Sequence, residues 1–428
     1  MREAIFSREL ALKFKMKEQD FTRNRKQPFS SALLFMLNLL RRSLTIEIDG
    51  FIGHLNGCLS SGNMQRFTSS AFIQNRKKIN PGVFNHLSEI VVENFYADNN
   101  TWNLFRGFRI LAVDGSWITL PFTLELKTCY GVSKNASGAE IVQARASVLY
   151  DVLNDITLDA VLENLNIGER EMALRHSYQW RKNDLIIYDR GYPSYDFINE
   201  HIKMGVDCLI RVKVTHCASV IAFVATGKKS AITEIHPSKN QQFKDKEYNR
   251  HSTLKVRLLR IELPGGEVEV LMTTLLDSQK YPAKMFKELY FLRWGIETFY
   301  DELKNKLKVE HFTGYSKVSI QQDFFCAIFI SNLQSVMVND LEDELSVQNQ
   351  GKKYNYKINT NLSYGFLKNR ILELLYQQAP LDEIFQELET LFLKNTVPIR
   401  NDRTQPRNMD KYKHRRIPKV TKNQKDAI

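Results

Sequence analysis

The chain has 428 residues, which is enough for two or three structural units at about 150 residues per domain. Hydrophobic residues make up 43% and charged residues 25%, a balance that excludes collagen-like, disordered and disulfide-stapled mini-proteins. The 60 Lys and Arg outnumber the 48 Asp and Glu, and the resulting net charge of +12 suggests a polyanionic partner.

The cysteines and histidines show no zinc-binding pattern. None of the five cysteines forms a Cys-x-x-Cys pair, and none of the nine histidines forms a His-x-x-x-His pair. An odd, scattered number of cysteines fits a reducing compartment, so a cytoplasmic protein is expected. The apolar runs at 32–40 and 324–338 are too short or too polar for the ~20 residues of a bilayer span, so no membrane partner is expected.

The amino-terminal region is predicted to be helical after a basic, flexible arm. Residues 1 to about 30 show no clear pattern, whereas 31–95 show leucines at helical spacing. Thr68 can cap a helix that ends in the cations at 76–78. This basic end fits a DNA contact and an ordinary helix terminus equally well.

The centre of the chain alternates strands and helices. The predicted strands are 109–113, 141–152, 156–162, 185–188 and 208–214, and the predicted helices are 169–180 and 195–204. Gly205 is the expected stop of the second helix. This order indicates an α/β fold in which helices cover a sheet.

The character of the sequence changes from 215 to 280, where it becomes β-rich. Alternating residues at 254–263 and 267–275 flank Pro264-Gly265-Gly266, which predicts a hairpin. One long amphipathic helix is then predicted at 284–308, and further helices are predicted within 316–395.

The segment 396–428 is basic, with ten Lys and Arg against three Asp and Glu. It has little apolar periodicity. It fits a tail that binds DNA phosphates without reading sequence, or a solvated tail that aids solubility.

Two aspartates come directly after predicted buried strands. Asp114 begins Asp-Gly-Ser, and Asp189 begins Asp-Arg-Gly-Tyr. Side chains at the carboxyl ends of strands in α/β sheets project into the crevice where ligands bind, and carboxylate oxygens suit Mg²⁺. Taken alone, each aspartate more often simply starts a turn.

A third acid, Glu297, lies in the predicted helix at 284–308. At about 100° per residue, Tyr290, Arg293, Glu297 and Lys304 fall within roughly 60° of one another, beside the apolar stripe rather than opposite it. A ladder of ion pairs within the helix is the alternative interpretation.

Together these motifs resemble those of bacterial insertion-sequence DDE transposases of the "insertion sequence four" group, which includes cut-and-paste relatives of the Tn type. The signature is Tyr290-x2-Arg293-x3-Glu297-x6-Lys304, and the motifs of Asp114 and Asp189 precede it in the expected order. A β-rich insertion between the second Asp and the Glu also matches. With named motifs the resemblance covers roughly 68–315.

The resemblance implies an RNase-H-like catalytic core that is interrupted by a β-rich insertion and flanked by helical regions. The implied divisions are a helical end-binding region at 1–95, the core at 105–214 and 281–315, the insertion at 215–280, a helical region at 316–395 and the basic tail at 396–428.

The resemblance also implies a chemistry, which is strand cleavage and strand transfer at the ends of an insertion sequence. Asp114, Asp189 and Glu297 would be the catalytic acids and would hold two Mg²⁺, for which Mn²⁺ is a possible substitute. The implied DNA contacts are Tyr290, Arg293, Lys304, Arg190, Tyr192 and Trp294. For Trp294, packing of its helix against the sheet is the alternative role.

The implied partners are double-stranded DNA, as terminal inverted repeats and as target, and a second copy of the chain in a synaptic complex. A non-catalytic DNA-binding relative and an RNase-H-like nuclease without strand transfer stay open as alternatives. The group holds a flipped base against a Trp in the insertion, but 215–280 contains no Trp here. Either this chain holds no flipped base, or another aromatic such as Phe223, Phe243 or Tyr248 takes the place of the Trp.

Overall fold

The computed structural model describes residues 1–23, 26–40, 42–58, 64–97, 102–135, 137–238, 242–243, 246–263, 266–376 and 381–400. It divides the chain into two compact units. The first unit comprises Met1–Trp102, Trp117–Ala144 and Asp301–Ile428, and the second comprises Asn103–Ser116 and Arg145–Tyr300. Most of the basic tail predicted at 396–428 lies outside the described residues.

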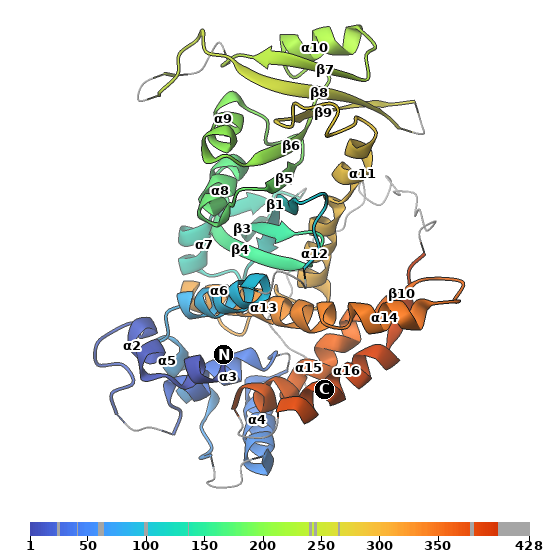
Figure 1. Ribbon diagram of the computed structural model, residues 1–428. Helices are drawn as coiled ribbons and strands as arrows, with labels where there is room; N and C mark the ends of the chain where they lie inside the picture. The colour runs from blue at the N-terminus through green and yellow to red at the C-terminus, as the bar shows by residue number, and fades with distance from the viewer. Residues whose placement is uncertain are drawn as a thin grey trace. The chain divides into compact units, whose positions relative to one another are not determined.

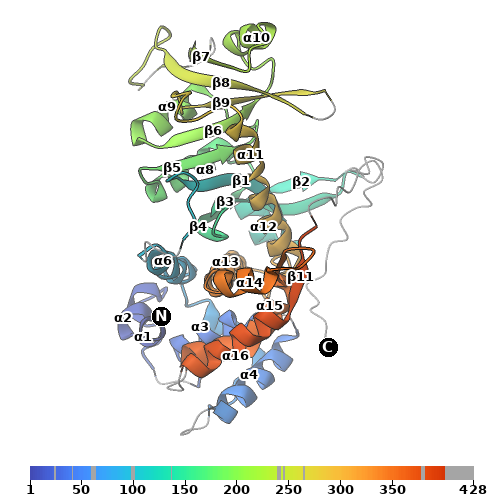
Figure 2. The same cartoon turned by 45° about the vertical axis from the view of Figure 1, so that its right-hand side comes forward.

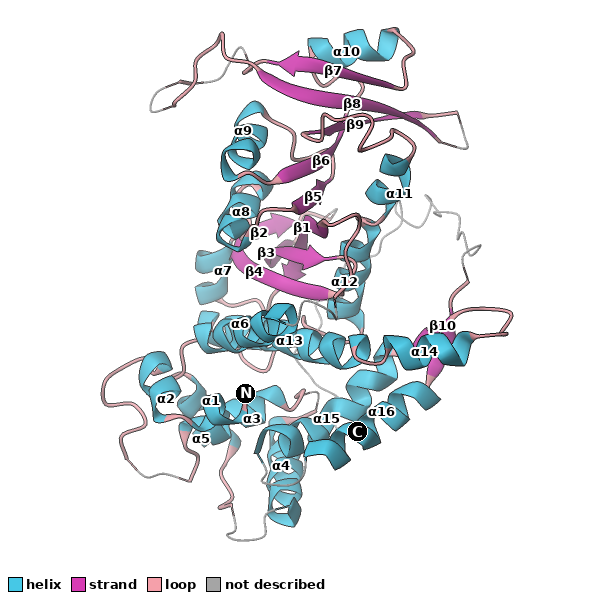
Figure 3. Cartoon of the chain, in the orientation of Figure 1, coloured by secondary structure: helices cyan, strands magenta, loops and turns pink. Residues whose placement is uncertain are grey.

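The first unit is mainly helical (Figures 1 and 3). Its helices are α1 (Arg2–Phe6), α2 (Arg8–Phe14), α3 (Phe29–Leu37), α4 (Leu44–Cys58), α5 (Ser69–Arg76), α6 (Gly82–Ala97), α7 (Leu124–Tyr130), α13 (Lys317–Asn339), α14 (Glu342–Asn349), α15 (Thr360–Tyr376) and α16 (Leu381–Lys394). Its short strands are β2 (Val132–Lys134), which pairs with the beginning of β3 (Glu140–Asp151), and the pair β10 (Tyr356–Ile358) and β11 (Thr396–Pro398).

The first residues of the chain form helices, so the prediction of a flexible basic arm is wrong for α1 and α2. The Ser7 hydroxyl accepts a hydrogen bond from the backbone N–H of Leu10 and caps α2. Ile5, Leu10 and Phe14 are buried. Charged residues stand between these three apolar positions, so the helical spacing of the buried side chains is hard to recognise in the sequence.

Helices α6 and α13 lie side by side and form the centre of the first unit (Figures 1 and 2). Between them the Asn332 side chain donates a hydrogen bond to the Ser88 hydroxyl at 2.8 Å. No single helix in the described part of the chain is long and apolar enough to cross a bilayer. The bent pair α13 and α14 passes that test only when its two helices are taken together.

The structure decides between a DNA contact and an ordinary helix terminus for Arg76, the first cation at the end of α5. Thr68 caps the helix as predicted, because its hydroxyl accepts from the N–H of Ala71. Arg76 is 2% exposed, and its guanidinium donates to the Asp323 carboxylate and the Gln322 amide oxygen, both at 2.8 Å. The Arg76 side chain therefore holds α5 against α13 and is not available to DNA.

The second unit is built on a mixed sheet (Figure 3). Its strands are β1 (Arg109–Thr119), β3, β4 (Ile156–Asn164), β5 (Asp184–Tyr188), β6 (Asp207–Val212), β7 (Ser230–Ile235), β8 (Leu254–Glu262) and β9 (Val268–Thr273), and β1 and β3 also contribute residues to the first unit. In this unit the strand order is β4-β3-β1-β5-β6-β9-β8-β7, with β1, β5 and β6 parallel and β9, β8 and β7 antiparallel to their neighbours. The prediction of an α/β fold is confirmed at this level.

The β-rich segment continues the same sheet. The hairpin predicted around 264–266 is formed by β8 and β9, and β9 pairs with β6 from Leu209↔Thr273 to Val212↔Val270. A helix that was not predicted, α10 (Ala218–Ala225), precedes β7. Strands β7 to β9 extend the sheet instead of forming a separate one because their apolar side chains become buried there; Val256, Leu258 and Leu259 of β8 are fully buried.

The remaining helices of the second unit are α8 (Glu169–Arg175), α9 (Tyr195–Met204), α11 (Met285–Phe291) and α12 (Trp294–Asn305), and a 3₁₀ turn at His176–Gln179 follows α8. Gly205 ends α9 with φ of 67°, as its position predicts. The last residues of α12 belong to the first unit.

Helix α11 packs on the sheet through a buried apolar cluster. Phe286, Leu289 and Tyr290 of α11 lie in this cluster with Ile110 of β1 and Ile187 of β5. Side chains from three elements are thus fixed against one another, so the position of α11 relative to the carboxyl ends of β1 and β5 is well defined.

The single helix predicted at 284–308 is broken into α11 and α12. The break falls at Leu292 and Arg293, where the N–H of Arg293 bonds to the Tyr290 carbonyl three residues before it. Gly295 follows, and a Cβ there would lie 3.3 Å from the Cβ of Val152. The close approach of α12 to the end of β3 explains why residue 295 is a glycine and why the helix breaks just before it.

Candidate active site

Asp114 and Asp189 lie level with each other at one edge of the parallel strands. The pairing of β1 with β5 runs from Arg109↔Asp184 to Ala112↔Ile187. The same register, continued by two residues, pairs Asp114 with Asp189. Asp189 follows the last residue of β5 as predicted, but β1 continues to Thr119, so Asp114 lies inside its strand rather than after it.

The Tyr290 hydroxyl reaches Asp189 from α11. It donates a hydrogen bond to Oδ1 of Asp189 at 3.2 Å. Tyr290 is 7% exposed, and burial is the main cause that raises the pKa of its phenol. The phenol therefore stays protonated and acts as a donor that orients the Asp189 carboxylate.

Arg293 lies between Asp114 and Glu297. Its Nη2 donates to Oε1 of Glu297 at 2.7 Å, and its Nη1 lies 3.8 Å from Oδ2 of Asp114. The guanidinium is 4% exposed, and its Nε has no hydrogen-bond partner in the described part of the chain. One cation thus serves two acids that are 183 positions apart in the sequence.

Helix α12 is fixed against the strands that carry the aspartates. The Tyr300 hydroxyl donates to the backbone carbonyl of Asp114 at 3.0 Å. The rings of Tyr150 in β3 and Phe299 in α12 stack with their centroids 4.7 Å apart. These contacts and the close approach of Gly295 fix the first turns of α12, which carry Glu297, next to Arg293 at the break between α11 and α12.

The acids repel one another. The pKa of Asp114 is raised to about 6, mainly by burial; the Gly115 N–H at 2.8 Å and Arg293 lower it, whereas the charges of Glu297 and Glu169 raise it. A carboxylate with this balance lacks counter-charge. In the described residues, no three His, Cys, Asp or Glu side chains lie close enough together to hold a metal ion.

The other residues that were predicted to contact DNA differ in exposure. Arg190 is exposed, and Trp294 is 39% exposed, so neither is confined to packing. Tyr192 is 1% exposed, and this burial removes it from the predicted set of DNA contacts. Lys304 belongs to the first unit, where its ammonium donates to the Trp117 carbonyl at 2.7 Å, and burial lowers its pKa.

Glu169 was missed by the sequence analysis. It is the first residue of α8, and its charge acts on Asp114. No spacing or motif in the sequence relates Glu169 to the two aspartates, because α8 reaches them only through the fold.

A second polar cluster has the hydrogen-bond order of a nucleophilic triad. The Ser147 hydroxyl lies 3.0 Å from Nε2 of His176, whose Nδ1 lies 2.6 Å from Oδ2 of Asp159. Ser147 is 1% exposed and His176 is fully buried. No substrate reaches this serine, so the cluster ties β3, β4 and the 3₁₀ turn together.

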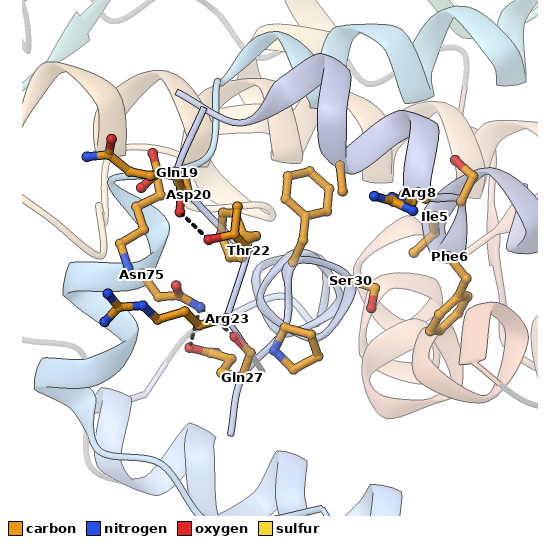
Figure 4. A pocket seen from close by; sticks show the side chains of 16 residues that line it. Ile5, Phe6, Arg8, Gln19, Asp20, Thr22, Arg23, Gln27, Ser30 and Asn75 are labelled. Carbon is orange, nitrogen blue, oxygen red and sulfur yellow. Dashed lines mark hydrogen bonds between the residues drawn. The ribbon is translucent and has the colours of Figure 1, made fainter. Parts of the chain in front are cut away.

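The first unit contains a polar hollow of about 680 Å³ between α1, α2 and the start of α3 (Figure 4). Arg8, Arg23 and Lys78 line it beside a single acid, Asp20. None of the predicted catalytic acids lines it.

Comparison with known proteins identifies the family. The family model described as "Transposase DDE domain" matches residues 106–333, which include Asp114, Asp189 and Glu297. The chain belongs to this family. It is a DDE transposase of the kind found in insertion sequence IS4, with the DNA cleavage and strand-transfer activity of the family.

Two individual proteins resemble this transposase. "Transposase InsG for insertion sequence element IS4" of Escherichia coli (strain K12) is 23% identical over 357 residues, which are 81% of this chain and 77% of that protein. A solved structure, the "Cryo-EM structure of piggyBac transposase synaptic complex with hairpin DNA", aligns with 9% identity and a TM-score of 0.44 over 96% of this chain and 88% of that chain.

Proposed function

We propose that Asp114, Asp189 and Glu297 are the catalytic acids of this transposase and that they hold Mg²⁺, or Mn²⁺ in its place. The observation that carries this proposal is the linkage of the three acids within one unit: the β1–β5 register aligns the aspartates, and Arg293 joins Asp114 to Glu297. The family to which the chain belongs supports the same assignment.

The donor chemistry of the three residues suits a hard divalent cation, and the three carboxylates would have to move closer together to share one. All three side chains offer carboxylate oxygens, the ligands that Mg²⁺ prefers. Burial, with a smaller contribution from the charges of Glu297 and Glu169, raises the pKa of Asp114, and Arg293 offsets this only in part. A cation would supply the missing positive charge and, when bound, would polarise the phosphodiester and activate the attacking hydroxyl.

The neighbouring side chains prepare the acids for this role. Tyr290 fixes the orientation of the Asp189 carboxylate through its hydrogen bond. Arg293 holds Glu297, and its buried guanidinium would have to move outward to pair with a phosphate of the DNA once a metal ion had taken over the counter-charge. Lys304, Arg190 and Trp294 are the further DNA contacts in this proposal.

The proposal extends to the architecture and partners of the enzyme. The core at 105–214 and 281–315 is RNase-H-like, 215–280 is its insertion, 1–95 binds the element ends, and the helices at 316–395 and the basic tail at 396–428 complete the chain. The net charge of +12 supports double-stranded DNA as the partner, as terminal inverted repeats and target. The enzyme acts in the cytoplasm as a homodimer that joins two ends.

The test is cleavage of DNA that carries the ends of the element encoding this transposase. With Mg²⁺ or Mn²⁺, the purified enzyme should release 3′-hydroxyl ends and join them to a target plasmid. Binding without cleavage would point to a non-catalytic relative, and cleavage without joining would point to a nuclease.

A further inference from the structure

Glu169 lies beside both glycines that follow the proposed catalytic aspartates. Its Cγ lies 3.5 Å from the position that a Cβ on Gly115 would take, and its Oε2 lies 3.2 Å from that position on Gly191. Gly115 follows Asp114 directly, and Gly191 is two residues after Asp189. The Glu169 side chain therefore fills the space between the two aspartate motifs, and a side chain at residue 191 would displace its carboxylate.

The Glu169 carboxylate has no counter-charge of its own. It makes no hydrogen bond or ion pair with any group in the described part of the chain, whereas Glu171, on the same helix, pairs with Arg175 at 2.9 Å. Its charge acts on Asp114, Tyr192 and Tyr300. Glu169 is thus a fourth acid at this site, and Arg293 bonds to a different one.

Tyr192 supplies an independent observation. It is 1% exposed, and its hydroxyl has no hydrogen-bond partner in the residues that the structure describes. The backbone N–H of Tyr192 bonds to the Asp189 carbonyl at 3.2 Å, and burial, then the charges of Asp114, Glu169 and Asp189, raise the pKa of the phenol. A buried hydroxyl without a partner is unfavourable, so a polar ligand is expected against it.

We infer that Glu169 and Tyr192 are positioning residues that hold the water molecules of a hydrated divalent cation at the Asp114 and Asp189 carboxylates. This inference rests on the proposed function. Mg²⁺ keeps several of its waters when it binds protein carboxylates. Such water donates its protons, one to a carboxylate without a partner, such as that of Glu169, and one to the oxygen of an unpaired hydroxyl, such as that of Tyr192.

The test is Mn²⁺ binding to the full chain without DNA. Electron paramagnetic resonance measures the concentration of free Mn²⁺, and thermal unfolding measures the stabilisation that bound Mn²⁺ provides. Glu169→Gln keeps the shape of the side chain and should weaken Mn²⁺ affinity about tenfold, within the range for residues that support metal ligands. Tyr192→Phe should weaken it several-fold. The matched control Glu171→Gln, on the same helix, should bind as the wild type does.

Two further measurements distinguish a role of Glu169 in metal binding from a purely structural role, and a failure of this inference from a failure of the proposed function. Cleavage by Glu169→Gln should recover at higher Mn²⁺ concentration, which a misfolded protein would not do, and its thermal unfolding without metal should match that of the wild type, which a loosened site would not do. An unchanged Mn²⁺ midpoint in Glu169→Gln, together with a weakened one in Asp114→Asn, overturns the inference alone. An unchanged midpoint in Asp114→Asn overturns the proposed function as well.

A second variant guards against loss of folding in Glu169→Gln. Gly191→Ala places a methyl group against Oε2 of Glu169. Because Gly191 is exposed, this substitution should leave the fold intact. It should raise the Mn²⁺ midpoint while circular dichroism stays that of the wild type. Wild-type Mn²⁺ binding by a folded Gly191→Ala protein contradicts the inference.

Discussion

Arg293 is the residue on which the charge balance of the site depends. Its guanidinium is buried, bonds to Glu297 and approaches Asp114 within 3.8 Å. Burying a cation is unfavourable unless it is paired, and here the same pairing offsets the repulsion between the acids. In the absence of a metal ion, Arg293 thus stabilises an arrangement that its acids alone would oppose.

Replacing Arg293 should make the fold depend on divalent cations. Arg293→Met leaves Asp114 and Glu297 without their shared counter-charge, so the free energy of unfolding without metal should fall by about 2 kcal/mol. Added Mn²⁺ should restore more stability to this variant than it adds to the wild type. Urea unfolding with and without Mn²⁺ measures both quantities.

The control for this comparison is Arg190→Met, an exposed arginine directly after Asp189. It should unfold at the wild-type urea concentration. Equal stability of Arg293→Met and Arg190→Met would show that Arg293 is not the counter-charge of the site.

At the scale of elements, buried polar side chains fix the helices to their neighbours. His201 joins α9 to β5, because its Nε2 lies 2.8 Å from the Tyr188 hydroxyl and its Nδ1 lies 2.8 Å from the Phe197 carbonyl. The carbonyl can only accept, so Nδ1 carries the proton and Nε2 accepts from Tyr188. This pattern requires the neutral ring.

The stability of the second unit should therefore fall in mild acid. Burial lowers the pKa of His201 to about 4, from 6.5 for an ordinary histidine. A lowered pKa contributes stability above pH 6.5 that is lost as the pH falls towards 4, on the order of 3 kcal/mol. Denaturant unfolding followed by Trp180, whose ring lies 4.4 Å from that of His201, should show this loss.

Two variants assign this pH dependence to one residue. His201→Gln should unfold with a flatter dependence on pH between 4 and 6.5, whereas His251→Gln, at an exposed position, should keep the wild-type slope. If both variants kept the wild-type slope, another group would be responsible.

Arg76 fixes α5 to α13 in the first unit in a comparable way. Arg76→Met leaves the Asp323 carboxylate without its cation and should lower the free energy of unfolding by about 3–5 kcal/mol. Lys77→Met, next to it and exposed, should change stability by less than about 0.5 kcal/mol. Weaker DNA binding by Arg76→Met under conditions in which the variant stays folded would instead favour a DNA contact by Arg76.

At the scale of the whole molecule, the sequence predicted the elements whose signals are local. The strands at 109–113 and 185–188 are short apolar runs, and Gly205 ends α9 through a conformation that glycine adopts easily. The hairpin of β8 and β9 follows from alternation around a turn. The Tyr290-x2-Arg293-x3-Glu297-x6-Lys304 signature, with the two Asp motifs before it in order, was enough to indicate the family.

The features that were missed depend on contacts between distant segments. The break between α11 and α12 contains no proline, and it arises where α11 packs on the sheet and Gly295 meets Val152. The burial of Tyr192 and the approach of Glu169 to Gly191 likewise require the folded sheet. No periodicity reports such contacts, since each joins segments that are separate in the sequence.

The central claim is that Glu297, with Asp114 and Asp189, carries out the chemistry. The most direct measurement is Mg²⁺-dependent cleavage of labelled element-end DNA by Glu297→Gln, with Glu288→Gln on the exposed side of α11 as control. We expect Glu297→Gln to bind these ends within about twofold of the wild type but to cleave them at least ~10³-fold more slowly, while Glu288→Gln cleaves normally. Cleavage by Glu297→Gln at the wild-type rate would contradict the account.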